Sequence, residues 1–245
     1  MQNRRYGLLG FPLKHSFSKT YFESKFLREK IRKCSYENFE LPKIEDLKLL
    51  LQEVNLMGFN VTIPYKKLII PYLHSLEPMA EKVGAVNCVK RVDSNWIGFN
   101  TDVIGFGNSL KPLLQSHHTH ALVLGTGGAS KAVCFVLEQL GIEFLNVSRQ
   151  ERQDCISYND LNYEVINAYK IIINTTPIGT FPEEDVSPPL PYEYLSPSHL
   201  CYDLIYNPAE SLFLKNSSAM GAETKNGLEM LEMQAEESWR IWNTN

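Results

Sequence analysis

The sequence has no long hydrophobic run and no excess of positive charge. None of its apolar runs approaches the roughly 18 residues that a membrane-spanning helix needs. Its 24 Lys and Arg residues stand against 28 Asp and Glu residues, so the formal net charge is −4. A chain without a broad basic field is not expected to bind nucleic acid. We therefore expect neither a membrane nor a nucleic acid as a partner.

Cysteine is scarce, and no targeting segment is expected. The five cysteines form no C-x-x-C motif and their number is odd, which is typical of reduced thiols in the cytosol. The first apolar run is short and is broken by Gly10 and Pro12, unlike that of a signal peptide. These features predict a cytoplasmic protein that needs no disulfide to hold its core together.

A metal site is not expected either. His117, His118 and His120 lie close together in sequence, but they occupy a polar connector with no cysteine nearby. Protein zinc sites combine Cys, His or carboxylate ligands at characteristic spacings. We interpret this segment as a solvated linker without a metal.

The strongest positive signal lies in residues 121–149. An apolar run at 121–124 leads into a glycine-rich turn, which is followed by apolar positions at helical spacing and by a second apolar run at 142–147. This pattern predicts a strand, a turn, a helix and a strand, which together form one right-handed βαβ unit. Glycines in such a turn let backbone N–H groups approach a pyrophosphate at the helix N-terminus. The predicted dinucleotide contacts in this turn are Gly125, Thr126, Gly127, Gly128, Ala129 and Ser130.

The end of the second strand of such a unit selects the dinucleotide. An acidic residue there would bind the ribose 2′-hydroxyl of NAD, whereas the sequence has Arg149 between Ser148 and Gln150. A guanidinium suits a 2′-phosphate, which it can bind with two hydrogen bonds. We therefore predict NADP, with an ordinary exposed arginine as the alternative.

Regular patterns on both sides of this unit predict an α/β protein. Expected strands lie at 6–9, 35–41, 57–63, 88–91, 96–99, 170–174 and 200–204. Helices are expected after Ser16 or Ser18, at 42–54, from 102, after an Asn207 cap at Pro208, and at 227–242. The polar connector at 115–120 is the best single domain boundary in this pattern, and the helix from 102 is expected to belong to the hinge.

A second group of polar residues lies in the first half of the chain. In the strand at 57–63, Phe59 and Val61 alternate with Asn60 and Thr62, and Lys66 follows the strand. An isolated Lys66 would be an ordinary surface lysine, and Asp102 alone would be a helix N-cap. Their joint occurrence in a fixed chain order favours a functional interpretation.

Several motifs together give the chain a family resemblance. They are HSFS at 15–18, NVTIPYK at 60–66, GAVN at 84–87, NTD at 100–102, GTGGAS at 125–130, NTTPIG at 174–179, YDLIY at 202–206 and NGLEMLEMQAE at 226–236. They cover nearly the whole chain, which resembles the shikimate dehydrogenases. The resemblance implies reversible reduction of 3-dehydroshikimate to shikimate with NADPH, in the biosynthesis of chorismate and the aromatic amino acids.

The resemblance also implies roles for individual residues. Lys66 and Asp102 would be the catalytic pair, because a ketone that gains a hydride needs a proton donor. Residues similar to the substrate-binding set are Ser16, Ser18, Asn60, Thr62, Asn87, Tyr206 and Gln234. Besides the glycine-rich turn and Arg149, the residues similar to cofactor contacts are Thr175, Leu204, Gly227 and Met230.

The implied architecture has two α/β domains with a cleft between them. A mixed-sheet substrate domain would comprise 1–101 and 227–245, and a Rossmann-like NADP domain would comprise 102–226. The last helix would return to the first domain. We expect a small-molecule substrate and a monomer or homodimer. Two other functions stay open, an NAD-dependent quinate/shikimate dehydrogenase and a non-catalytic NADP-sensing regulator. The presence of both Ser16 and Ser18 favours shikimate over quinate.

Overall fold

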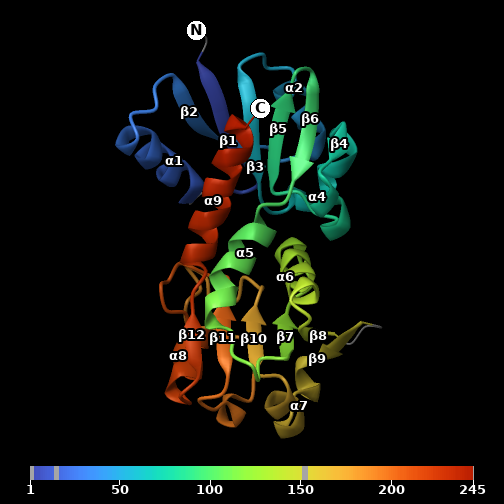
Figure 1. The fold of residues 1–245 in the computed structure, drawn as a ribbon, viewed down its shortest axis with the longest axis vertical. Helices are drawn as coiled ribbons and strands as arrows, with labels where there is room; N and C mark the ends of the chain where they lie inside the picture. The colour runs from blue at the N-terminus through green and yellow to red at the C-terminus, as the bar shows by residue number, and fades with distance from the viewer. Residues whose placement is uncertain (1–2, 14–16, 151–153, 245) are drawn as a thin grey trace. The chain divides into compact units, whose positions relative to one another are not determined.

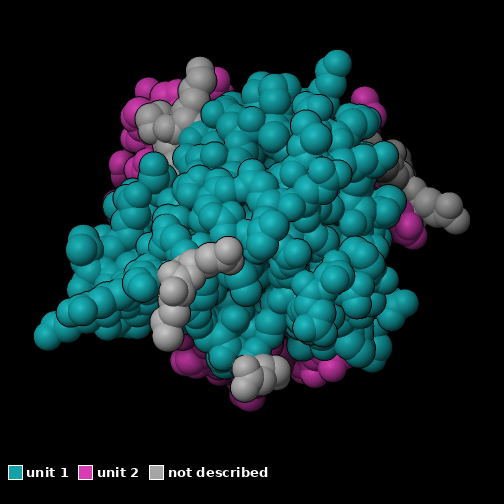
Figure 2. Space-filling model, turned by 90° about the horizontal axis from the view of Figure 1, so that it is seen from above, with its two compact units in different colours: residues 1–101, 235–245 teal, residues 102–234 magenta. Residues whose placement is uncertain are grey.

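The chain folds into two compact units, each built on its own sheet (Figure 1). The structure is a computed structural model that describes residues 3–13, 17–150 and 154–244. Residues 1–101 and 235–245 form unit 1, and residues 102–234 form unit 2; Figure 2 colours them separately. The sequence-based division has the same first boundary, but it places the second boundary ahead of the last helix rather than inside it.

Unit 1 contains a mixed sheet with strand order β2-β1-β3-β5-β6-β4 across its described residues. β1 pairs in parallel with β2 and β3, whereas β5 is antiparallel to both β3 and β6. The strands are β1 (Arg4–Gly10), β2 (Cys34–Glu40), β3 (Leu56–Val61), β4 (Ser75–Leu76), β5 (Cys88–Val92) and β6 (Asn95–Phe99). The helices are α1 (Phe17–Arg28), α2 (Leu47–Leu50), α3 (Tyr65–Leu68), α4 (Pro78–Val83) and the second part of α9 (Leu228–Asn243).

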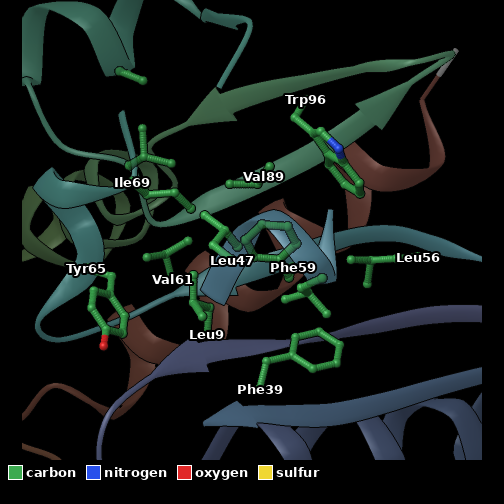
Figure 3. Close-up of a cluster of buried hydrophobic side chains, with 13 residues drawn as sticks. Leu9, Phe39, Leu47, Leu56, Phe59, Val61, Tyr65, Ile69, Val89 and Trp96 are labelled. Atoms are coloured by element: carbon green, nitrogen blue, oxygen red, sulfur yellow. The ribbon is translucent and has the colours of Figure 1, made fainter. Parts of the chain in front are cut away.

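Strand alternation divides the apolar side chains of unit 1 between the two faces of its sheet. Phe59 and Val61 of β3 belong to one buried cluster, in which Phe59 lies beside Leu47 (Figure 3) and 5.7 Å from the ring of Trp96. On the other face, α1 and α9 pack on β1, with the rings of Tyr6 and Trp242 stacked at 4.8 Å. Asn60 lies between Phe59 and Val61 in β3, so its side chain is directed to the α1 and α9 side.

Unit 2 contains a sheet with strand order β12-β11-β10-β7-β8-β9, and every pairing among its described strands is parallel. This is the order of a doubly wound dinucleotide-binding sheet, with its switch point between β7 and β10. The strands are β7 (His120–Leu124), β8 (Glu143–Ser148), β9 (Cys155–Ser157), β10 (Ile171–Asn174), β11 (Leu200–Asp203) and β12 (Glu223–Lys225). The helices are α5 (Asp102–Leu110), α6 (Gly128–Gln139), α7 (Tyr163–Ala168), α8 (Leu212–Ala219) and the first part of α9.

The α/β class, the mixed first sheet and the Rossmann-like second sheet predicted from the sequence are confirmed. Two predicted helices are wrong in extent. The helix expected at 42–54 is reduced to a 3-10 turn and α2, because the chain turns after Leu51 and leaves Val54 71% exposed. The helix expected at Pro208 begins instead after Ser211, whose hydroxyl caps α8 by accepting from the Leu214 N–H. His118 is buried rather than solvated.

The helices were compared with the length and hydropathy that a membrane-spanning helix needs. Among residues 3–13, 17–150 and 154–244, no helix is both long enough and apolar enough to traverse a bilayer.

Candidate functional site

The glycine-rich turn of unit 2 has the geometry of a phosphate-binding turn. It connects β7 to α6 at the switch point, with Gly125 at a φ of +105° and Gly127 as the helix N-cap. A Cβ placed on Gly127 would meet no protein atom within 4 Å. Thr126 and Gly127 are exposed, and the N–H groups of the first turn of α6 have no helical partners. An anion can therefore approach this turn closely, and the helix dipole favours one there.

The loops after β7 and β10 are in direct contact. The backbone N–H and the hydroxyl of Thr175 both donate to the carbonyl oxygen of Leu124, at 3.0 and 2.6 Å. A Cβ on Gly125 would lie 2.9 Å from the Thr175 hydroxyl oxygen. Two residues predicted from separate motifs as cofactor contacts are thus neighbours at the switch point.

A second pair of predicted cofactor contacts meets where β11 ends and α9 begins. Gly227 donates its backbone N–H to the carbonyl of Ile205 at 2.9 Å, and it is packed tightly against the backbone of Leu204. The half-buried Tyr206 follows, and burial raises the pKa of its phenol.

Asp203, at the end of β11, was not among the residues selected from the sequence. Its side chain is fully buried, and its carboxylate accepts from Asn174 Nδ2 and the Ile205 N–H, both at 3.0 Å, and from the Ser211 hydroxyl. Burial raises the pKa of this carboxyl to about 6, against the opposing effect of the three hydrogen bonds. The YDLIY motif at 202–206 contains this residue and was the available signal.

Arg149 follows β8, as predicted, and its side chain is exposed. Burial raises the pKa of the nearby Tyr158 phenol to about 12, and the positive charge of Arg149 opposes that rise. Arg149 is therefore an accessible cation beyond the strand end that, in dinucleotide-binding sheets, faces the adenosine ribose.

The predicted residues Asp102, Met230 and Gln234 come together within unit 2. Asp102 begins α5 and is 5% exposed. One turn later, a Cβ on Gly105 would lie 2.5 Å from the carbonyl oxygen of Met230 and 3.1 Å from Cβ of Gln234. Glycine at 105 therefore lets α9 pack directly on the first turn of α5, which keeps buried Gln234 close to the turn that carries Asp102.

Unit 1 contains a buried polar network centred on Asn60. The side-chain Oδ1 of Asn60 accepts from the Tyr36 hydroxyl at 2.9 Å, and its Nδ2 donates to the Ser238 hydroxyl at 2.8 Å. The Thr101 hydroxyl lies 3.2 Å from the Ser238 hydroxyl, and the Thr101 N–H donates to Asn87 Oδ1 at 2.6 Å. The network therefore connects β2, β3 and α9 with the two segments that contain Asn87 and Thr101.

The sequence motifs contain only part of this network. Asn60 and Asn87 were predicted, whereas Tyr36, Thr101 and Ser238 were missed. Thr101 belongs to the NTD motif and could have been selected. Ser18 also belongs to the network, because it forms a hydrogen bond with Tyr36. Burial raises the pKa of the Tyr36 phenol, and this hydrogen bond opposes the rise. Ser16 lies outside the described residues.

Lys66 lies in α3, one turn after β3. Its carbonyl oxygen accepts from the Val86 N–H at 2.8 Å, which places the NVTIPYK segment against the GAVN segment. The backbone of Thr62 donates to Leu9 and accepts from Tyr65, both at 2.8 Å, so the half-buried Thr62 side chain is fixed between β1 and α3. Unit 1 thus groups Lys66, Thr62 and Asn87 at one end of β3.

Comparisons with known proteins agree on one family. Residues 8–89 match the family described as the shikimate dehydrogenase substrate binding domain. The chain is 38% identical to a shikimate dehydrogenase (NADP(+)) of Caldanaerobacter subterraneus subsp. tengcongensis, over 97% of this chain and 90% of the relative. The crystal structure of shikimate dehydrogenase from Aquifex aeolicus is similar with a TM-score of 0.87, at 34% identity over 98% of this chain and 92% of that one. The Thermus thermophilus shikimate 5-dehydrogenase, solved in complex with NADP(H) and shikimate, has a TM-score of 0.86 at 31% identity, over 98% and 93% of the two chains.

Proposed function

Since the chain belongs to the shikimate dehydrogenase family, we propose that it catalyses the reversible, NADPH-dependent reduction of 3-dehydroshikimate to shikimate. This step would serve chorismate and aromatic amino-acid biosynthesis. The structural observation that carries the dinucleotide part of the proposal is the parallel sheet of unit 2, which has an open glycine-rich turn at its switch point; the substrate is proposed from the family. We further propose that the protein acts in the cytoplasm as a monomer or homodimer.

The residues of unit 2 fit NADP. The space beside Gly127 and the N–H groups at the start of α6, which point out of the helix, suit a pyrophosphate, and exposed Arg149 suits a 2′-phosphate. The rest of the NADP molecule is proposed to contact Thr175, Leu204, Gly227 and Met230. When bound, NADPH supplies the hydride.

Lys66 and Asp102 are the proposed catalytic residues. As the substrate ketone is reduced, negative charge develops on its oxygen, and the Lys66 ammonium would stabilise that charge and donate a proton to it. In the direction of shikimate oxidation, neutral Lys66 would accept the hydroxyl proton. Asp102 would orient Lys66.

The remaining predicted residues are proposed to hold the substrate. The hydroxyls of Ser16 and Ser18 and the phenol of Tyr206 would bind the carboxylate. Asn60, Thr62, Asn87 and Gln234 would bind the ring hydroxyls. The network around Asn60 supports this assignment for Asn87, because two hydrogen bonds with Thr101 orient its amide: Nδ2 donates to the Thr101 hydroxyl, and Oδ1 accepts from the Thr101 N–H. A site built to hydrogen-bond hydroxyl groups discriminates strongly against analogues that lack them.

Steady-state kinetics with two substrates and two cofactors test this proposal. We expect the highest kcat/KM for shikimate with NADP. A preference for quinate or for NAD would instead assign the chain to the quinate/shikimate dehydrogenase type. Binding of NADP without turnover of either substrate would assign it to a nucleotide-sensing regulator.

A further inference from the structure

Asp203 is a buried carboxylate that the proposed chemistry does not use. It ends β11 in the interior of unit 2, and no ion pair to it occurs among the described residues. Its three hydrogen-bond donors, Asn174, Ile205 and Ser211, are neutral. Burying a carboxylate without a cation lowers stability. Since burial of Asp203 lowers the stability of the protein, we look for its role in the groups that its hydrogen bonds orient.

One of these hydrogen bonds fixes the orientation of the Asn174 amide. Nδ2 of Asn174 donates to Asp203, so Oδ1 is directed the other way, towards the loop after β10. There Oδ1 accepts from the backbone N–H of Thr176 at 3.0 Å and from its hydroxyl at 2.6 Å. The Thr176 hydroxyl oxygen in turn accepts from the Ile178 N–H at 3.3 Å. Through Asn174, a carboxylate on β11 is thereby connected to Thr176 and Ile178 in the loop after β10.

This loop lies against the phosphate-binding turn. A Cβ on Gly125 would lie 2.9 Å from the Thr175 hydroxyl oxygen and 3.0 Å from Cγ2 of Thr176. Such separations leave no room for a side chain at position 125, so Thr175 and Thr176 lie close to the glycine backbone of the turn. A shift in residues 175–178 would therefore change the shape of the switch point, where dinucleotides bind to sheets of this kind.

We propose that Asp203 is a positioning residue for NADP: through Asn174 and Thr176 it holds the 175–178 loop in the conformation that receives the cofactor. The inference rests on the proposed function, because it assumes NADP as the ligand of unit 2. Asp203 itself does not contact the cofactor in this account.

Two substitutions interrupt this connection at different points. In Asp203→Asn, a neutral amide with only one acceptor oxygen faces three donors. Thr176→Val keeps the side-chain shape but removes both hydrogen bonds of the hydroxyl. We expect each variant to weaken NADP binding by about tenfold, which corresponds to 1.4 kcal/mol. The double variant should bind no more weakly than the weaker single variant, because both act through one route.

Ser109→Ala is the matched control. The Ser109 hydroxyl is buried 2.7 Å from the hydroxyl of Tyr202, the residue that precedes Asp203 in β11. Its loss removes a buried hydrogen bond from the same strand but does not affect the 175–178 loop. We expect a lower Tm with unchanged affinity for NADP.

Titration calorimetry of NADP and, separately, of shikimate provides the readout, with Tm measured for every variant. We expect weaker NADP binding in Asp203→Asn and Thr176→Val, and shikimate binding that stays at the wild-type level. NADP binding at the wild-type level in folded Thr176→Val would overturn the inference, whether or not Asp203→Asn folds. Equal weakening of NADP and shikimate would also overturn it, since that result indicates a general structural effect. A wild-type protein that binds no NADP would instead refute the proposed function.

Discussion

The carbonyl oxygen of Leu204 lies 2.1 Å from the position that a Cβ on Gly227 would occupy. No side chain fits in that space, so glycine is required where α9 begins against the loop after β11. This packing constraint accounts for Gly227 without any cofactor. Gly127 is different, because a Cβ there would meet no protein atom within 4 Å, and its φ of −78° suits any residue.

Gly127→Ala should therefore weaken NADP binding without unfolding the protein. The added methyl group would occupy the space through which a pyrophosphate approaches the backbone, at a cost of about 1–3 kcal/mol, whereas the change at the N-cap should cost less than about 1 kcal/mol of stability. Gly107→Ala is the control, because its Cβ would be in ordinary contact with Val136 at 3.6 Å. Calorimetry that gives both variants the wild-type NADP affinity would argue against a cofactor at this turn.

Lys66→Ala should lose most turnover while NADP affinity changes little. Removing a general acid typically lowers kcat by about 10²- to 10⁴-fold. Lys67→Ala is the matched control, because Lys67 is the next residue of α3 and its side chain is exposed. If kcat of Lys66→Ala stayed within a few-fold of kcat of Lys67→Ala, the catalytic role of Lys66 would be wrong.

Arg149→Ala should reduce selectivity for NADP. Losing a charge-assisted hydrogen bond to a phosphate costs about 1.5–3 kcal/mol, so kcat/KM for NADP should fall by about 10- to 150-fold while the value for NAD stays unchanged. Lys215→Ala removes the same charge from an exposed position of α8 in the same unit. Equal losses with NADP and NAD would indicate that Arg149 does not select the 2′-phosphate.

The buried carboxyl of Asp203 should make stability depend on pH. Its pKa of about 6 in the folded protein lies above the ordinary value of 3.8, so the folded state binds more protons than the unfolded state between these two values. The free energy of unfolding should then decrease as pH rises from about 4 to about 6, by on the order of 3 kcal/mol from this group alone. Urea unfolding across this range should show that decrease in the wild type relative to Asp203→Asn. Parallel curves for the two proteins would contradict the raised pKa.

Helices, strands and turns whose signals lie within a few positions of one another in the sequence were largely predictable. The run from Ala121 to Arg149 carries its strand, turn and helix signals together, and β7, α6 and β8 form where these signals lie. The short strands β4, β9 and β12 have two or three residues each and no alternating pattern, so only their sheet partners define them. The helix expected after Pro208 failed because Ser211, three residues later, provides the cap.

Side-chain networks between distant positions were not predictable. The hydrogen bond between Asn60 and Ser238 joins residues 178 positions apart, and nothing in the local pattern of either residue indicates the other. Asp203 illustrates the same limit: a lone carboxylate at a strand end gives no sign of its donors, which lie on another strand and in a following loop. Such contacts follow from packing rather than from propensity.

The oxidation of NADPH in the presence of 3-dehydroshikimate tests the central claim most directly. We expect loss of nicotinamide absorbance that requires 3-dehydroshikimate, is much slower with NADH, and is nearly abolished in Lys66→Ala but not in Lys67→Ala. A purified, folded wild-type protein that binds NADPH but does not oxidise it when 3-dehydroshikimate is added would contradict the account.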